Sequence, residues 1–364
     1  MALSKITNAS VADTAVHGRR RINQNGAMTI SQRGSSFAIA HQSATYTLDR
    51  YKIWEETGGS CTISQSSTAP SGFTNSFKVD ITGADTSLAA SEHCVFYQNI
   101  EAQDLQHLEF GTSSAKTLSV SFWVRSNKTG TYILNIFKPD QTTQMMSKSY
   151  TINSADTWEK KVISIPACTS SGIDNNNGTG LQFIFYLATG TAFSSGTLQT
   201  TWGSDTVANR AVGQVNLFDS TNNEWYMTGL QIEVGDASPF EHRSHGEELA
   251  LCQRYYFQET KPIYGVFTVG RVFNSKTPQF GYSFPVPMRT LPSISNVGSG
   301  CGVWFSSGSE TQLSNPAFYQ DNTSGTDLIK GSLVFSANSN LSDNNGVALC
   351  SHAADSGLAF SAEL

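Results

Sequence analysis

Short runs in which apolar and small polar residues alternate recur along most of the chain, separated by clusters of Gly, Asn, Asp and Ser. Alternation with a period of two residues is typical of a strand with one buried face, and such clusters end strands. In the first two thirds of the chain, runs of this kind predict strands over Tyr46–Trp54, Ser76–Ile81, Leu118–Val124, Thr131–Phe137, Trp158–Ile165, Leu181–Leu187 and Trp225–Val234. We therefore expect an all-β fold, with a jelly-roll-like antiparallel β-sandwich in this region.

Two neighbouring runs indicate how strands are joined. Leu118–Val124 and Thr131–Phe137 are separated by Arg125–Gly130, a stretch that contains Ser, Asn and Gly. A short connection of this composition between two alternating runs is typical of a β-hairpin. The pattern predicts that these two strands pair with each other.

A helical pattern follows the sandwich. Ser244 stands three residues before Glu247, the spacing at which a hydroxyl and a carboxylate cap the first turn of a helix. Leu249, Cys252 and Tyr256 then recur at the spacing of one helix face. We expect a helix from Ser244 to Phe257 that lies against the base of the sandwich and is the longest in the chain.

The remaining pattern sets the domain organisation. After the helix, further strands are predicted over Tyr264–Phe273, Gln279–Val286, Gly302–Phe305, Leu328–Ser336 and Gly346–Ser351. The first residues show no long apolar period and are punctuated by Asn, Ser and Gly. The expected organisation is an extended anchoring arm (1–35), the sandwich (36–242), a helical connector (243–260) and a smaller C-terminal β domain (261–364).

Composition narrows the class of protein. The 364 residues are enough for two or three domains, and 29 acidic against 23 basic residues give a net charge of −6, which argues against a nucleic-acid partner. No basic start with an apolar block stands near Met1 and no apolar run reaches membrane-spanning length, so we expect a soluble, non-secreted chain without a membrane partner. The widely spaced cysteines are expected to be buried free thiols; they are Cys61, Cys94, Cys168, Cys252, Cys301 and Cys350.

Three segments, Arg21–Gly34, Tyr46–Tyr51 and Pro239–Tyr256, occur in this order around the interior strands Leu118–Val124 and Trp225–Gly235. Together they resemble a widespread family of phage tail and virion proteins with a carbohydrate-binding-like jelly-roll domain. The resemblance covers roughly residues 20–257, about two thirds of the chain. It implies a structural protein of a tailed-phage virion, made in the host bacterial cytoplasm: a tail fibre, spike or other surface appendage that binds host-surface glycan.

The resemblance also bears on assembly and leaves two alternative functions. Weak sites for repeating glycans gain strength when several copies bind together, and appendages are commonly symmetric, so we expect a homo-oligomer, with a trimer favoured. One alternative is a capsid decoration protein that clamps shell subunits without binding glycan. A less favoured one is a polysaccharide-degrading enzyme, because no nucleophile, metal or paired-carboxylate motif is recognisable; a non-enzyme is expected.

Candidate site residues fall into two groups. Aromatic rings in polar loops are the candidates for stacking on sugar, at low specificity: Trp202, Trp225, Tyr226, Trp304 and Tyr319. Charged residues of the three segments are interpreted as structural ties between the arm and the sandwich: Arg33, Asp49, Arg50, Glu241 and Arg243.

No cofactor or metal is expected. Asp174–Gly178 and Asp343–Gly346 are rich in side-chain oxygens and end in Gly, which invites a calcium interpretation. Both depart from the spacing of a calcium-binding loop, so plain turns are predicted, and a structural calcium stays an open alternative.

The arm generates a prediction about assembly. Its few apolar residues cannot bury one another, so the ordering of the arm must be offset by contacts with the body or with another subunit. We expect residues 1–18 to dock on other virion proteins and Arg21–Gly34 to pack on its own sandwich. Deleting residues 1–18 should leave a folded, soluble protein that no longer enters virions; deleting through Gly34 should also lower the melting temperature. Normal incorporation of the shorter deletion would place the anchor elsewhere.

Overall fold

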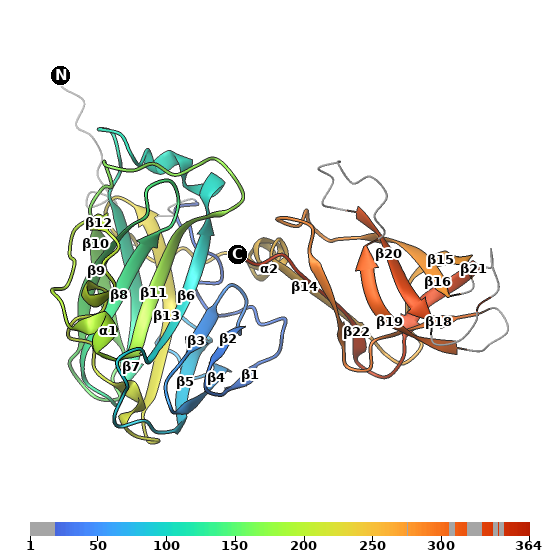
Figure 1. Cartoon of the computed structure of the whole chain (residues 1–364), viewed down its shortest axis with the longest axis horizontal. Helices are drawn as coiled ribbons and strands as arrows, with labels where there is room; N and C mark the ends of the chain where they lie inside the picture. Colours follow the sequence, from blue (N-terminus) through green and yellow to red (C-terminus); the bar gives the residue numbers. More distant parts are fainter. Residues whose placement is uncertain (1–18, 275, 306–309, 319–329, 338–340, 342–345) are drawn as a thin grey trace. The chain divides into compact units, whose positions relative to one another are not determined.

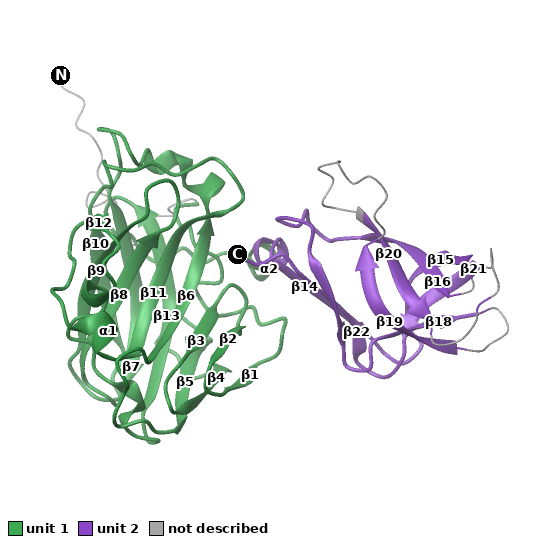
Figure 2. Cartoon of the chain, in the orientation of Figure 1, with its two compact units in different colours: residues 1–248, 364 green, residues 249–363 purple. Residues whose placement is uncertain are grey.

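The computed structural model describes residues 19–274, 276–305, 310–318, 330–337, 341 and 346–364 (Figure 1). Among the described residues strands account for 48% and helices for 8%, so the predicted all-β class is confirmed. Two compact units are present, one of residues 1–248 with 364 and one of residues 249–363 (Figure 2). Their boundary lies within helix α2 (His245–Gln253), inside the connector expected at 243–260. Within the described ranges no helix has the length and apolar character needed to span a membrane.

The first unit is an antiparallel sandwich of two sheets (Figure 1). One sheet has six strands, here called sheet A, in the order β1 (Ser36–Ile39), β4 (Ser60–Ser66), β5 (Ser76–Gly83), β13 (Glu224–Val234), β7 (Leu118–Ser126) and β10 (Glu159–Ile165). The other has seven strands, here called sheet B, in the order β12 (Gly203–Ser204), β9 (Gln144–Ile152), β8 (Gly130–Lys138), β11 (Thr179–Thr189), β6 (His93–Glu101), β3 (Lys52–Glu55) and β2 (Ser43–Tyr46). The chain passes repeatedly from one sheet to the other, as in a jelly roll.

Alternation along the strands builds the core between the sheets. On β7 the apolar members Leu118, Val120, Phe122 and Val124 are fully buried in that core. Phe122 packs edge-on against Phe185 of β11, with ring centroids 5.3 Å apart, and Phe185 stacks on Phe96 of β6 at 4.9 Å. Stacked and edge-to-face rings at these distances stabilise a core beyond the area that they bury.

The predicted hairpin is wrong. β7 pairs with β10 and β13 in sheet A, whereas β8 pairs with β9 and β11 in sheet B. The connection bonds to the start of β13 instead of closing a hairpin: Asn127 accepts a hydrogen bond from the Glu224 amide at 2.8 Å. Alternation identifies a strand and its buried face, but in a two-sheet fold it does not identify the partner.

Other elements also differ from the sequence expectations. The run Tyr46–Trp54 contains parts of two paired strands, β2 and β3, because Arg50 adopts a left-handed backbone (φ 73°) between them. A 3-10 helix, η2 (Ala102–Leu108), is not predicted by the sequence pattern. In the first unit the pattern also does not predict β1, β4, β6, β9 and β12, and in the second unit it does not predict the strands Tyr256–Lys261, Ser293–Val297, Glu310–Phe318 and Ser356–Ser361. In β6 and β9 apolar residues occur on both faces or stand beside Ser and Lys, so no period of two is visible.

The N-terminal segment joins the sandwich from residue 19 onward. The Ile22 amide donates to the Ile232 carbonyl at 2.8 Å, and the Leu230 amide donates to the Gly26 carbonyl at 2.9 Å. A Cβ on Gly26 would overlap the Leu230 carbonyl oxygen, so glycine permits this close approach. Met28 is fully buried in the core. The segment expected to be an arm therefore divides, with residues 19–34 packed on the sandwich and residues 1–18 outside the described residues.

The start of α2 carries the predicted cap, since the Ser244 hydroxyl accepts from the Glu247 amide at 3.2 Å. The predicted helix face is wrong at its far end, because α2 ends at Gln253 and Tyr256 begins strand β14 (Tyr256–Lys261). The buried residue of the first turn is the charged Glu248.

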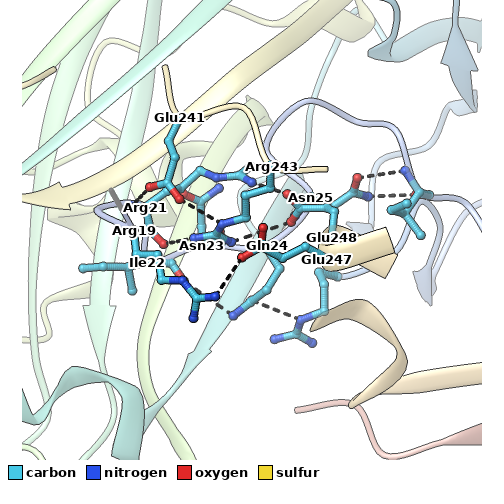
Figure 3. A network of polar contacts seen from close by, with 12 residues as sticks. Arg19, Arg21, Ile22, Asn23, Gln24, Asn25, Glu241, Arg243, Glu247 and Glu248 are labelled. Carbon is cyan, nitrogen blue, oxygen red and sulfur yellow. Dashed lines mark hydrogen bonds and ion pairs between the residues drawn. The ribbon is translucent and has the colours of Figure 1, made fainter. Parts of the chain in front are cut away.

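Glu248 is the centre of a buried polar network (Figure 3). Its carboxylate pairs with the Arg21 guanidinium and accepts from the Asn25 amide, and the Arg243 guanidinium lies 3.8 Å away. Glu241 accepts from the Arg21 amide at 2.7 Å and bonds Arg243 at 3.2 Å. Burial is the main reason why the pKa of Arg21 is lowered, and Glu248 opposes that shift. The network ties the N-terminal segment to the end of the sandwich.

The other expected ties are nearby. The Asp49 carboxylate accepts from the Gln32 amide at 2.8 Å, and Arg50 donates to the Asn99 carbonyl at 2.7 Å. The Arg33 guanidinium lies 5.2 Å from the centre of the Tyr46 ring. With Glu241 and Arg243, these residues link the segments of the resemblance within the first unit.

The second unit contains a three-stranded sheet and a closed six-stranded barrel. The sheet has the order β14, β22 (Ser356–Ser361) and β17 (Ser293–Val297). The barrel has the order β15 (Val266–Asn274), β16 (Thr277–Ser283), β20 (Lys330–Ala337), β19 (Glu310–Phe318), β18 (Cys301–Trp304) and β21 (Gly346–Ser351). Phe280, Val303, Leu333 and Leu349 belong to its core. All six cysteines of the chain are buried free thiols.

The buried network predicts a large effect of one substitution. Glu248→Leu leaves the Arg21 charge buried without its carboxylate, which should cost about 3–5 kcal/mol of unfolding free energy. Urea unfolding followed by tryptophan fluorescence measures this loss. Lys116→Gln, which breaks the exposed pair with Glu109, is the matched control and should cost less than about 1 kcal/mol. Equal effects of the two variants would contradict the central role of Glu248.

Candidate functional site

The aromatic residues expected to contact ligand are not gathered at one site. Trp225 is fully buried between the sheets, so it is a core residue and that prediction is wrong. The polar residues before it suggest a loop, whereas β13 already begins at Glu224. Trp202 is half-buried beside the core and donates to the Pro166 carbonyl at 2.7 Å, which gives it a packing role.

The remaining candidates differ in accessibility. Tyr226 is 5% exposed and donates to Glu224 at 2.6 Å, with the cations of Lys78 and Arg125 over its ring, so its faces are already occupied. Trp304 is 37% exposed and lies beside Tyr264, with ring centroids 5.6 Å apart, on the barrel of the second unit. Tyr319 lies outside the described residues.

The structure instead forms a recess on the outer face of sheet B. It crosses the adjacent strands β3, β6, β11 and β8 and is bounded by the segment that follows β11. Its volume is about 260 Å³. The lining consists of Trp54, His93, Val95, Tyr97, Phe137, Gln182, Ile184, Tyr186, Phe193 and Arg210. Aromatic rings dominate this lining, a composition typical of ligand pockets.

Strand alternation brings these side chains to one face. On β6, His93, Val95 and Tyr97 point away from the sandwich, while Phe96 between them belongs to its core. On β3, Trp54 faces outward because its neighbour Ile53 is buried in the core. Register places Trp54 opposite Val95. Because the strands are hydrogen-bonded to one another, the lining is held on a rigid surface.

The rings form a connected row. The Trp54 and His93 rings meet edge to face with centroids 5.0 Å apart, and His93 lies 4.6 Å from Phe193. Trp54 is 40% exposed, and its indole nitrogen donates to Glu56 at 2.9 Å, which fixes the orientation of the ring. An exposed, oriented indole is a flat apolar platform at the mouth of the recess.

Two polar groups in the recess are available to a ligand. Within the described part of the chain, the Tyr97 hydroxyl and the Gln182 side-chain amide make no hydrogen bond to protein. Burial raises the pKa of Tyr97, so the group remains a neutral hydroxyl at physiological pH. Between them, the phenol and the amide can both donate and accept.

Arg210 is the charged residue of the lining, and it is neutralised. Its Nε donates to Asp205 at 2.8 Å, and a second nitrogen pairs with the other oxygen of that carboxylate. Burial alone would lower the pKa of Arg210, but Asp205 and Tyr186 outweigh it and raise that pKa. The guanidinium also lies 5.4 Å from the centre of the Phe137 ring. The recess therefore carries little net charge.

Sequence reasoning missed this site because it assigned aromatic residues inside strands to the core. A signal was present: His93–Tyr97 and Leu181–Leu187 are apolar or aromatic on both faces, although an antiparallel sandwich has only one interior. A strand with two apolar faces must have its outer face covered or used for binding.

The loop considered for calcium forms a network of its own. Asp174 accepts from the Gln141 side chain at 2.8 Å, and Asn176 accepts from the Gly178 amide at 2.7 Å. The buried Lys138 ammonium donates to the Gly172 carbonyl at 3.0 Å and to Ser171 at 2.7 Å. This lysine places a positive charge beside the loop. Among the described residues no three His, Cys, Asp or Glu side chains are grouped as metal ligands; most of Asp343–Gly346 lies outside them.

The sequence matches no family model and no curated protein. Among solved structures, the chain is similar to the enzymatically active domain of tailspike protein 4 of bacteriophage CBA120, with 11% identity, a TM-score of 0.30, and coverage of 59% of this chain and 21% of that one. A family 4 carbohydrate-binding module gives 14% identity, a TM-score of 0.30 and coverage of 59% and 99%. A family 11 module from Clostridium thermocellum, in complex with a mixed-linked tetrasaccharide, gives 13%, 0.27, and 57% and 98%.

His93 generates a pH prediction for the recess. Burial is the main reason why its pKa is lowered, although the nearby Glu56 opposes the shift and Arg210 adds to it. Because the folded pKa lies below the unfolded one, neutral His93 contributes stability that is fully present above about pH 6.5 and is lost as the pH falls through the folded pKa. Unfolding free energies of wild type and His93→Gln, measured above and below that pH, should therefore converge on acidification. A difference that does not change with pH would contradict this.

Proposed function

We propose that this chain is a structural surface protein of a tailed-phage virion, such as a tail fibre or spike, and that it binds host-surface glycan in the recess on sheet B. The recess is the observation that carries the proposal. Its class of ligand follows from the side chains that line it, and its setting in a virion from the three segments of the resemblance.

The lining suits a sugar. The apolar face of a pyranose ring stacks on an aromatic ring such as Trp54, while hydroxyl groups at the ring edge need donors and acceptors. Tyr97 and Gln182 supply these without breaking an existing hydrogen bond among the described residues. Because the groups are held on paired strands, little order has to be gained on binding.

The lining also favours binding over hydrolysis. Glycosidases use two carboxyl groups on either side of the scissile bond, about 5–10 Å apart. Among the described residues that line the recess there is no Asp or Glu. The nearby carboxylates, Glu56 and Asp205, are bonded to Trp54 and Arg210. We therefore propose a non-catalytic role.

Contacts within the first unit support the virion part of the proposal. Arg21–Gly34, Tyr46–Tyr51 and the start of Pro239–Tyr256 lie far apart in sequence, yet Asn25 bonds both to the Asp49 carbonyl at 3.0 Å and to Glu248. The segments that resemble the phage family thus belong to one structural unit. Docking of residues 1–18 on other virion proteins and assembly as a homotrimer remain part of the proposal. Several copies would strengthen the weak binding expected of one small recess.

Two exposed tryptophans provide a matched test. Trp54→Ala removes the platform of the recess. It should weaken binding to a microbial polysaccharide that the wild-type chain binds by about 2 kcal/mol, or about 30-fold. Trp304→Ala removes a similarly exposed indole from the second unit and should leave binding unchanged. Glycan arrays and calorimetry on the full chain measure both effects, with melting temperatures to confirm folding.

The outcomes separate the candidate sites. Loss of binding in Trp304→Ala alone would move the glycan site to the barrel. No binding of the wild-type chain to any arrayed glycan would contradict the glycan part of the proposal and favour a decoration protein.

A further inference from the structure

We infer that the recess takes the terminal unit of a glycan chain, and that this unit is an uncharged sugar; the inference rests on the proposed function. An internal stretch of a polysaccharide needs a groove that is open at both ends. The recess is closed on one side by the segment 190–214, which follows β11.

The segment 190–214 lies over strands β8 and β9, next to the recess. Helix α1 (Thr191–Ser194) contributes Phe193 to the lining, and Arg210 comes from the far end of the segment. Between them, the Gln199 carbonyl accepts from the Ser147 amide of β9 at 2.7 Å, and beyond Arg210 the Gln214 side chain accepts from the Ile133 amide of β8 at 2.8 Å. A chain that crossed the recess would meet this segment at β8 and β9.

The segment is a fixed wall. Its Ala211 is fully buried in a small apolar cluster with Val95, Ile133 and Tyr186 from the outer face of sheet B. The Ala211 amide donates to the Phe193 carbonyl at 2.9 Å, and the Ala192 amide donates to the Ala90 carbonyl at 2.8 Å. Opening the wall would expose this cluster and break these bonds, so it does not behave as a lid.

The volume of the recess and the exposure of its lining also favour a terminal sugar unit. The volume of about 260 Å³ lies below the range of about 300–1,000 Å³ that holds drug-sized ligands, so it suits one sugar ring better than several. The exposed member of the lining is Trp54, on β3, at the side opposite the part of the wall over β8 and β9. The rest of the glycan would leave the recess over this residue.

Charge selects among terminal sugars. The lining has one guanidinium, and it is already paired with Asp205 at 2.8 Å. Tyr97 and Gln182 are neutral. A carboxylate on the sugar would lose water without gaining an unpaired cation, which disfavours acidic units.

The test counts chain ends. A microbial polysaccharide that the full chain binds is partly hydrolysed to half its mean length. The number of binding sites per gram of polysaccharide is then measured by calorimetry before and after hydrolysis. Recognition of termini doubles the sites per gram, whereas recognition of internal units leaves them unchanged or fewer. Competition with methyl glycosides of neutral hexoses and of hexuronic acids then identifies the class of unit, with Trp54→Ala as the binding-deficient control.

Doubled sites together with competition by a neutral glycoside support the inference. Unchanged sites, or competition by the uronic acids alone, overturn it while leaving glycan binding intact. If no polysaccharide binds, the proposed function fails and this inference fails with it.

Discussion

The first unit depends on one buried ion pair. Arg21 and Glu248 are 1% and 5% exposed at their side chains, and removing both charges from water costs several kcal/mol unless each is paired and hydrogen-bonded. The Asn25 amide and Arg243 complete the shell of Glu248. This requirement fixes the N-terminal segment against β13 and holds the first turn of α2 on the sandwich. Displacing Glu248 leaves the buried Arg21 charge without its carboxylate.

The recess forms because a two-layer sandwich buries only the inner face of each sheet. The inner faces of sheets A and B bury each other, which leaves the outer face of sheet B to be covered or exposed. The segment 190–214 lies over β8 and β9 and also covers Val95 of β6 and Tyr186 of β11, while Trp54 on β3 stays exposed. A boundary between a covered and an open region of one sheet is thus where the recess forms. Its rigidity comes from the same strands that build the core.

Sequence reasoning reached the fold class, most long strands of sheet A and the helix cap at Ser244. It failed where the answer depends on partners distant in sequence. The strands β7 and β8 read as a hairpin because alternation carries no information about which sheet a strand joins. The sequence alone does not identify Trp54 and Tyr97 as site residues. The outward face of a strand becomes a site only when neighbouring strands align their side chains and a loop closes one side.

The separation of Arg21 and Glu248 by 227 positions has a consequence for synthesis. A nascent chain emerges at about 5–20 residues per second, so the N-terminal segment waits for many seconds before its partner carboxylate exists outside the ribosome. Strand β13, which lies between β5 and β7 in sheet A, is also made late, so until it emerges these two strands lack their common neighbour and Met28 has no finished core to enter. Completion of the first unit is therefore timed by translation past α2, and a pause before that point prolongs the exposure of an unpaired strand edge.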